Sequence, residues 1–186
     1  MCRTQWIGAL CGAALLVSSP LAGLQVFAQD AGSKEYFVKA AFLYNFVKFI
    51  EWPGNLAVSK ISNLNICVVG DNPFDGATAV FKEASTDKLK LSVLEYRDWK
   101  GVPDNCHMLF ISRSESGRIN EIFNALQQKP VLSVSDIDHF AEKGGIIGFV
   151  LSNNKIKLVV NKKAAETAGL RVDAQLLEIA LNVIDR

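Results

Sequence analysis

Four cysteines are the residues of this chain best suited to covalent chemistry, and their positions limit what they can form. Cys2 and Cys11 lie in an N-terminal segment with the layout of a secretory signal, so export would remove them. Cys67 and Cys106 would remain, and two cysteines in an oxidising compartment are more often bridged than free. They lie 39 positions apart, a loop for which chain entropy gives about 4 kcal/mol of stabilisation. We predict a disulfide between Cys67 and Cys106.

Metal binding and catalysis have weaker support in the sequence. A metal site would combine these two cysteines with His107 and Asp104, but the closely spaced ligand pairs of zinc sites are missing. Motifs of the types Gly-x-Ser-x-Gly, P-loop and His-Glu-x-x-His are also missing. We expect His107 and His139 to be surface residues and not general bases. The sequence therefore predicts no metal, no cofactor and no catalytic activity, with an exported hydrolase as the remaining enzyme alternative.

Three expected strands are each followed directly by polar residues that could bind a ligand. Asp71 and Asn72 follow the first strand, Arg113 follows the third and Asp136 follows the fourth. Ligands of open α/β sheets bind outside the carboxyl ends of parallel strands, so these residues should converge in space. Arg113 would then pair with an anionic group of a small polar ligand. The alternative is that these residues only cap helices and form turns.

Alternating strands and helices must position these residues. Short apolar runs bounded by Gly, Pro, Asn or Asp predict strands at 64–69, 89–96, 108–112 and 131–135, then a hairpin with arms 146–151 and 155–160. Helical patterns are found at 36–52, 74–84, 119–127, 137–143, 162–168 and 173–184, the last with Asp173 as N-cap. This order predicts a single-domain α/β fold: a three-layer sandwich with a mostly parallel sheet, closed by a C-terminal antiparallel hairpin, and helices on both faces.

The expected helix at 36–52 is apolar nearly all the way round. Its polar exceptions are Lys39, Asn45, Lys48 and Glu51. They point in four well-separated directions, whereas an ordinary surface helix collects its polar residues on one side. We therefore expect burial on more than one face, by the protein's own core or by another protein. Trp52, beside Pro53 at the helix end, should be half exposed and is a candidate partner contact.

The N-terminal segment predicts export. Arg3, an apolar run at 6–17 and small residues up to Ala28 predict a signal peptide at 1–28, with 29–186 as the mature domain. A retained membrane anchor is the alternative, although the apolar run is shorter than the roughly 20 residues that a bilayer requires. The mature chain would carry 19 basic and 19 acidic residues. This balance argues against nucleic acid or an anionic membrane surface as partner.

Several segments resemble the YfiR-like family of bacterial periplasmic proteins. They are KAAFLYNFVKFIEWP at 39–53, ICVVG at 66–70 with Pro73-Phe74, FIS at 110–112, VLSVSD at 131–136, GGIIGF at 144–149, Asn161, and the blocks at 164–165, 168–170 and 175–177. The first and last blocks are the specific ones. The resemblance extends over nearly the whole mature chain, from residue 36 to residue 184.

The resemblance implies a non-enzymatic periplasmic regulator. Such proteins repress an inner-membrane diguanylate cyclase by binding its periplasmic sensor domain, which lowers cyclic di-GMP signalling and biofilm formation. An outer-membrane peptidoglycan-associated lipoprotein can sequester the repressor, and a homodimer is expected. Cys67 and Cys106 match a structural bridge of the family, whereas a second cysteine pair that some members carry near Gly144 is absent here. A periplasmic small-molecule-binding protein, with its site at the carboxyl strand ends, is the alternative function.

Overall fold

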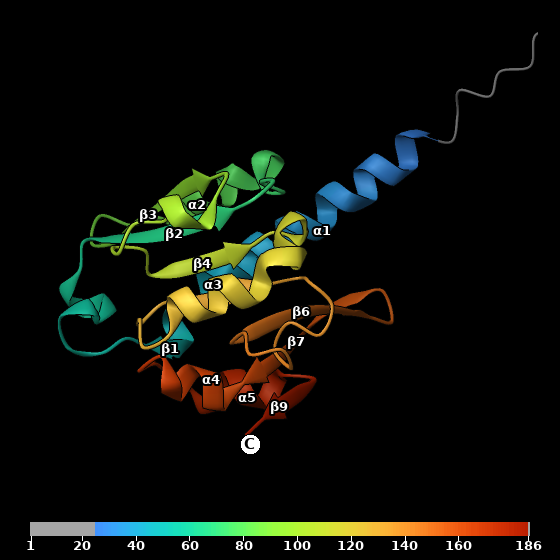
Figure 1. Cartoon of the computed structure of the whole chain (residues 1–186). Coiled ribbons are helices and arrows are strands. Elements are labelled where there is room, and N and C mark those ends of the chain that lie inside the picture. Colours follow the sequence, from blue (N-terminus) through green and yellow to red (C-terminus); the bar gives the residue numbers. More distant parts are fainter. Residues whose placement is uncertain (1–24, 186) are drawn as a thin grey trace, which may run out of the picture.

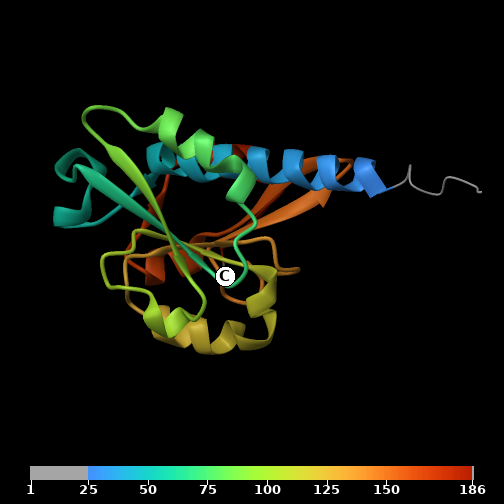
Figure 2. The ribbon, with the colours of Figure 1, turned by 90° about the horizontal axis from the view of Figure 1, so that it is seen from above.

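A seven-stranded sheet separates two layers of helices (Figure 1). The computed structural model describes residues 25–185. Its helices and strands are α1 (Gln25–Phe49), β1 (Ile50–Glu51), β2 (Asn63–Val69), α2 (Thr78–Ala84), β3 (Lys90–Tyr96), β4 (Met108–Ile111), α3 (Ile119–Leu126), β5 (Leu132–Ser135), β6 (Ile147–Ser152), β7 (Lys155–Asn161), α4 (Lys162–Thr167), β8 (Arg171–Val172), α5 (Ala174–Ile179) and β9 (Asn182–Ile184). Figure 2 shows α1 and α2 over one face of the sheet and α3 over the other.

The strand order of the main sheet is β3-β2-β4-β5-β6-β7-β9. The first five of these strands are parallel. β7 returns antiparallel to β6 through a hairpin, and β9 adds to β7 in parallel. A separate antiparallel pair, β1 with β8, ties the end of α1 to the C-terminal region. The predicted fold class is confirmed: this is a three-layer α/β sandwich with a mostly parallel sheet and an antiparallel hairpin.

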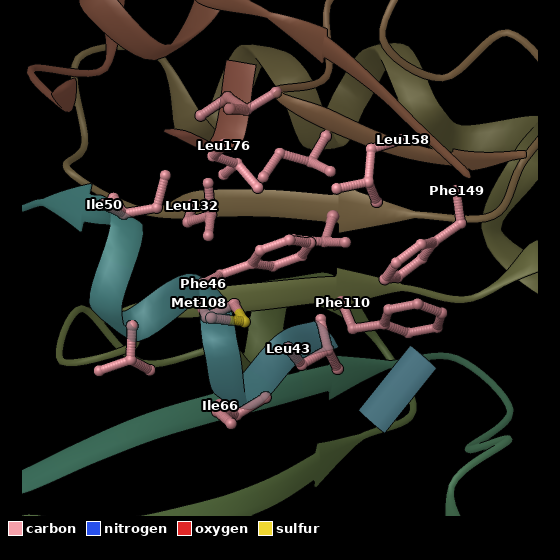
Figure 3. Packing of buried hydrophobic residues seen from close by; sticks show 14 of the residues in the cluster. Leu43, Phe46, Ile50, Ile66, Met108, Phe110, Leu132, Phe149, Leu158 and Leu176 are labelled. Atoms are coloured by element: carbon pink, nitrogen blue, oxygen red, sulfur yellow. The ribbon is translucent and has the colours of Figure 1, made fainter. Parts of the chain in front are cut away.

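The sheet has a hydrophobic core on each face because side chains alternate along its strands. In β4, Met108 and Phe110 join the core beneath α1, whereas Leu109 and Ile111 join the core beneath α3. All four side chains are buried, which explains why β4 is a continuous apolar run in the sequence. Figure 3 shows the larger core, where Leu43 and Phe46 of α1 lie against strand residues.

Helix α1 is longer than predicted at its start and shorter at its end. It begins at Gln25 and ends at Phe49, and residues 50–51 form the short strand β1. Residues 1–24, which hold most of the predicted signal peptide, lie outside the described part of the chain. The buried positions of α1 form one stripe, namely Lys39, Ala40, Leu43, Phe46 and Val47. Tyr36, Phe42 and Phe49 pack partly buried against the same core, and only Phe37, Val38 and Lys48 remain exposed between residues 36 and 50.

One predicted helix is absent, and another is shorter than predicted. Residues 137–143 form consecutive turns, because His139 has a φ of +58°, which a right-handed helix cannot include. The last helix does begin after its N-cap Asp173, whose side chain accepts a hydrogen bond from the Gln175 N–H, but it ends at Ile179. Residues 182–184 instead form β9, so the hairpin is not the last part of the sheet.

The predicted hairpin is confirmed. Ser152 pairs with Lys155, and only Asn153 and Asn154 lie between the arms. Both residues have positive φ, +50° and +56°, as a two-residue type I′ turn requires. Asparagine tolerates this conformation better than other side chains do.

Candidate functional site

The carboxyl ends of β2, β4 and β5 lie side by side, because these strands are parallel neighbours. The sequence placed Asp71, Asn72, Arg113 and Asp136 directly after these strands, and the fold brings them to one edge of the sheet. They divide into two groups there. Arg113 joins Asp136 in a largely buried ionic cluster, whereas Asp71 and Asn72 line a shallow depression.

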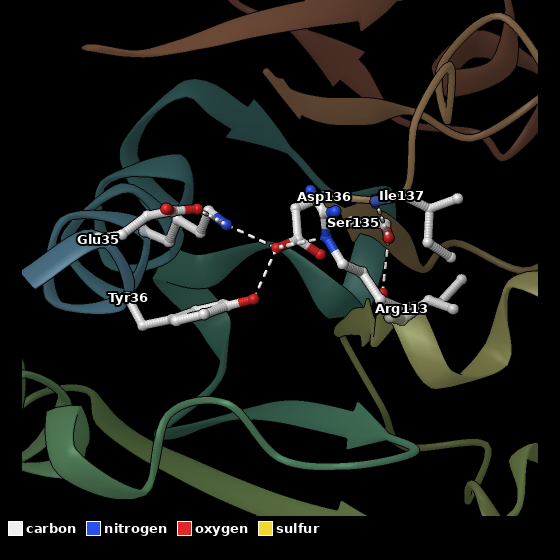
Figure 4. Close-up of polar contacts among 8 residues, drawn as sticks. Glu35, Tyr36, Arg113, Ser135, Asp136 and Ile137 are labelled. Carbon is white, nitrogen blue, oxygen red and sulfur yellow. Dashed lines mark hydrogen bonds and ion pairs between the residues drawn. The ribbon is translucent and has the colours of Figure 1, made fainter. Parts of the chain in front are cut away.

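Asp136 is the centre of the ionic cluster and is only 2% exposed. Its Oδ2 accepts hydrogen bonds from the Tyr36 hydroxyl at 2.8 Å and the Lys39 Nζ at 2.5 Å. The Arg113 Nε lies 3.4 Å from the same oxygen, from the solvent side. Lys39 is 1% exposed and also pairs with Glu35, one helical turn before it, at 2.5 Å. Figure 4 shows Tyr36 of α1 meeting Arg113 and Asp136, which lie in the loops after β4 and β5.

The charges of the cluster are strongly interdependent. Burial alone would raise the pKa of Asp136, but the hydrogen bond and charge of Lys39, with Tyr36 and Arg113, outweigh it and lower that pKa below the ordinary value. Burial and the hydrogen bond to Asp136 raise the pKa of Tyr36. Asp136 is therefore an anion at neutral pH, and Tyr36 stays protonated as a donor to it. The cluster therefore links α1 to the loops at the carboxyl ends of β4 and β5.

One acceptor of this cluster is unused. Asp136 Oδ1 is buried and has no hydrogen-bond partner among the described residues, while Tyr36, Lys39 and Arg113 all contact Oδ2. The hydroxyl of Ser135, the preceding residue, already has both a donor and an acceptor partner: it donates to Ile111 O at 2.6 Å and accepts the Ile137 N–H at 3.0 Å.

The sequence interpretation missed Lys39 and Tyr36 as partners of Asp136. A lysine on the buried stripe of an apolar helix is the signal that could have indicated a buried anion.

The depression beside Asp71 has a volume of about 690 Å³, and its lining is acidic on balance, with four carboxylates and one cation, Arg97. Asn72 is fixed within it, since its Nδ2 donates to Asp75 at 2.9 Å and to Glu95 at 2.8 Å. The Asp71 N–H donates to Ser114 Oγ at 3.0 Å, which joins the loops after β2 and β4. Arg113 does not line the depression, so the cation predicted to bind a ligand's anionic group is instead paired with Asp136.

The topology identifies this edge as the place where a doubly wound sheet binds ligands. The parallel strands follow the order β3-β2-β4-β5-β6, so the chain leaves β2 toward β3 on one side and resumes at β4 on the other. Ligands of such sheets bind at this switch point, outside the carboxyl ends of the two strands. In this protein the switch point lies between the loops at 70–72 and 112–115. The depression is open, and its acidic walls favour a cationic group.

Trp52 and His107 are both buried and are joined by a hydrogen bond. Trp52 is 4% exposed and donates from Nε1 to His107 O at 3.3 Å, so the expectation of a half-exposed ring is wrong. His107 is 7% exposed, and its Nδ1 accepts the Asn65 N–H at 3.2 Å. Burial lowers the pKa of His107, which keeps it neutral for this role. The expectation of a surface histidine holds for His139 but is wrong for His107.

The predicted disulfide is present. Cys67 of β2 is bonded to Cys106, which lies just before β4, and their Cα atoms are 6.1 Å apart. The bridge lies in the core beneath α3 and cross-links neighbouring strands of the sheet. Within residues 25–185 there is no cluster of three or more His, Cys, Asp or Glu side chains that could hold a metal. In the same range, no helix has the length and apolar character needed to cross a membrane.

An apolar groove lies at the projecting end of α1, where Glu35 of the ionic cluster is also part of its lining. It has a volume of about 700 Å³ and lies between α1 and the β6–β7 hairpin. Val38 and Phe42 of α1 line one wall, and Leu151 and Ile156 of the hairpin line the other. Val38 is 46% exposed and Leu151 is 64% exposed. Figure 2 shows both elements extending past the rest of the sheet at this end.

Comparisons with known proteins place the chain in a family. A model of the YfiR/HmsC-like family (DUF4154) matches residues 36–181. A search of curated proteins found no match. Among solved structures, an ABC domain in complex with L-Trp from Streptococcus pneumonia is similar, with 13% sequence identity and a TM-score of 0.47; the match covers 65% of this chain and 55% of that one.

A conserved domain protein from Vibrio cholerae O1 biovar El Tor has 12% identity and a TM-score of 0.49, and the match covers 80% of this chain and 60% of that one. The chain thus spans less than two thirds of either solved structure, and at these values neither likeness bears on function. The family match is of a different kind, because it extends over most of the chain, from the middle of α1 to the segment before β9. The chain belongs to the YfiR/HmsC-like family.

Proposed function

We propose that this protein is a periplasmic repressor that binds the sensor domain of an inner-membrane diguanylate cyclase and so lowers cyclic di-GMP signalling and biofilm formation. Membership of the YfiR/HmsC-like family supports a regulatory and non-catalytic role. The one structural observation that carries the proposal further is the exposed apolar groove between α1 and the β6–β7 hairpin. Another polypeptide could cover the apolar side chains that the protein's own core leaves exposed there.

The groove has the character of a protein contact. Exposed Val38 and Leu151 line the groove together with the half-buried Phe42 and Ile156, so apolar side chains of two elements contribute to one surface. Exposed apolar side chains that two elements bring together are a candidate contact for another polypeptide. The lining also includes the charged residues Lys34, Glu35 and Lys155. An apolar centre with a polar rim is the usual anatomy of a protein interface.

Repression then follows from a shift between two states of the sensor domain. A protein that binds both states of the sensor domain with equal affinity does not change the equilibrium between them. The repressor must therefore bind the inactive state more tightly than the active one. An outer-membrane peptidoglycan-associated lipoprotein that competes for the repressor would release the cyclase. A homodimer would present two grooves and so favour a dimeric sensor through avidity.

The test is genetic complementation. Deleting the gene should raise cyclic di-GMP and surface attachment, and the wild-type chain should restore both to their original levels. Leu151→Glu places a charge in the groove and should fail to restore them, although the protein accumulates normally. Leu181→Glu is the matched control, because Leu181 is 55% exposed and does not line the groove. Unchanged cyclic di-GMP in the deletion strain would refute the proposal.

A small-molecule-binding protein remains the second candidate, favoured by the depression at the switch point between β2 and β4. Its acidic lining, which includes Asp71 and Glu95, selects for a ligand with a cationic group. Thermal-shift screening with polyamines, amino acids, sugars and nucleotides would detect such a ligand. A saturable shift that Glu95→Gln weakens and Arg113→Ala leaves unchanged would support this function over repression alone.

A further inference from the structure

A second cavity, at the opposite end of the sheet from Asp136, has the chemistry of an anion site. It has a volume of about 330 Å³ and lies at the amino end of β5, between α3 and α4. Phe123, Leu126 and Ile146 give it an apolar wall. Its volume is at the lower end of the range found for small-molecule sites, which typically combine apolar walls with a few polar groups.

The polar groups of this cavity offer donors. Ser133 is 4% exposed, and its Oγ accepts the Ile146 N–H at 3.0 Å, while its own proton has no acceptor among the described residues. Asn161 is 8% exposed and uses one amide proton on Ala141 O at 2.8 Å, which leaves its second proton unassigned within the described chain. The hydrogen-bond acceptor of a bound ligand could therefore accept from both Ser133 and Asn161, which are largely buried.

The charged residues that line the cavity are all cationic. Lys143 and Lys163 both contribute to the lining, and none of the described residues that line it carries a carboxylate. Lys143 Nζ donates to Asp138 O at 3.0 Å, which leaves further protons of its ammonium group available. Lys163 Nζ has neither a hydrogen bond nor an ion pair with any described residue. An anion is attracted to this cavity, whereas an ammonium group would meet two like charges and no compensating acid.

We propose that this cavity binds a small organic carboxylate with an apolar body and no amino group. The apolar part would lie against the wall formed by Phe123 and Leu126, and the carboxylate would accept from Ser133, Asn161 and the lysines. Charge-assisted hydrogen bonds are the stronger kind, so the carboxylate would supply most of the selectivity. This site is distinct from the groove and from the carboxyl-end depression, and it is independent of the proposed repression.

The experiment is isothermal titration calorimetry of the full purified protein with 3-phenylpropionate. Saturable binding is expected, and two matched ligands should bind at least tenfold more weakly. Neutral 3-phenylpropanamide lacks the negative charge, and L-phenylalanine adds an ammonium group. Lys163→Gln should weaken binding of the acid about tenfold, the effect of losing one charge-assisted hydrogen bond. Lys90→Gln, an equivalent change at the far edge of the sheet on β3, should leave the affinity unchanged.

A second variant tests whether the acid binds in this cavity and not elsewhere on the surface. Ala168→Leu adds side-chain volume at the cavity wall without changing charge, and it should reduce the affinity for 3-phenylpropionate at least tenfold. The proposal is overturned if the acid shows no saturable binding, if the amide or the amino acid binds as tightly, or if Lys163→Gln and Ala168→Leu both bind like the wild type.

Discussion

At the scale of single residues, the Lys39–Asp136 pair is the most consequential interaction. Both side chains are almost completely buried, and Lys39 lies on the stripe that otherwise carries the core residues of α1. Removing one partner of a buried pair leaves a charge without compensation in the interior. Lys39→Met should therefore lower the free energy of unfolding by about 3–5 kcal/mol, measured by urea denaturation.

Two further variants make this prediction specific to the pair. Lys48→Met changes an exposed lysine of the same helix and should alter stability by no more than about 0.5 kcal/mol. Adding Asp136→Leu to Lys39→Met removes the orphaned charge and should recover most of the lost stability, since apolar replacements of whole buried pairs are often tolerated. A double variant as unstable as the single one would show that the pair is not the cause.

The same pair makes stability depend on pH in a defined direction. The pKa of Asp136 is lowered in the folded state, so the unfolded chain binds more protons at acid pH. The stabilisation is present above the ordinary aspartate value of 3.8 and is lost as the pH falls through the lower, folded pKa. Asp136→Asn should cost stability at about pH 6, and the difference from wild type should shrink toward about pH 2.5, by denaturation at each pH. A constant difference would contradict the lowered pKa.

Single residues also show where sequence reasoning succeeded at this site. Asp71, Asn72, Arg113 and Asp136 were placed at strand ends, and the parallel register brings them to one edge. Their partners could not be predicted, because Tyr36 and Lys39 are about one hundred residues away from Asp136 in sequence. Only the fold decides that Arg113 is neutralised by Asp136 and does not face the depression.

At the scale of elements, strands with strong apolar runs were predicted well and the C-terminal elements less well. β2 and β4 are buried on both faces, so their sequences alone indicate them. Residues 173–184 fit a helical stripe, yet only Leu176 of that stripe is buried, and the segment after Ile179 pairs with β7. The Leu181 N–H donates to Leu158 O at 2.7 Å. Tertiary pairing at an open sheet edge overrides local helical pattern here.

The disulfide is the element-scale feature with the clearest energetic prediction. It cross-links β2 to the segment before β4 and closes a loop of 39 positions. Cys67→Ala with Cys106→Ala should lower the free energy of unfolding by up to about 4 kcal/mol, because the unfolded chain gains the entropy of the open loop. Reductant should destabilise the wild type in urea and leave the double variant unaffected. Equal sensitivity of both proteins would mean that the effect arises elsewhere.

At the scale of the whole molecule, α1 connects the architecture to the proposed function. Its buried stripe holds the larger core together, and its other side leaves Phe37 and Val38 exposed where it projects past the sheet. The apolar character of this helix on all sides predicted burial on more than one face. The fold covers most of the helix, and the groove shared with the β6–β7 hairpin is where a second polypeptide could cover exposed Val38.

Export is the whole-molecule prediction on which the repressor proposal depends. Cleavage after Ala28 would remove Cys2 and Cys11 and leave a chain that begins at Gln29, within the first turns of α1. Intact mass spectrometry of periplasmic material should therefore give the mass of 29–186 less two hydrogens, with reduction restoring both. A chain that keeps its first 28 residues would instead support the membrane-anchor alternative. Two free thiols would mean that Cys67 and Cys106 are not oxidised in the compartment where the protein acts, which would remove the compartment argument for a periplasmic partner.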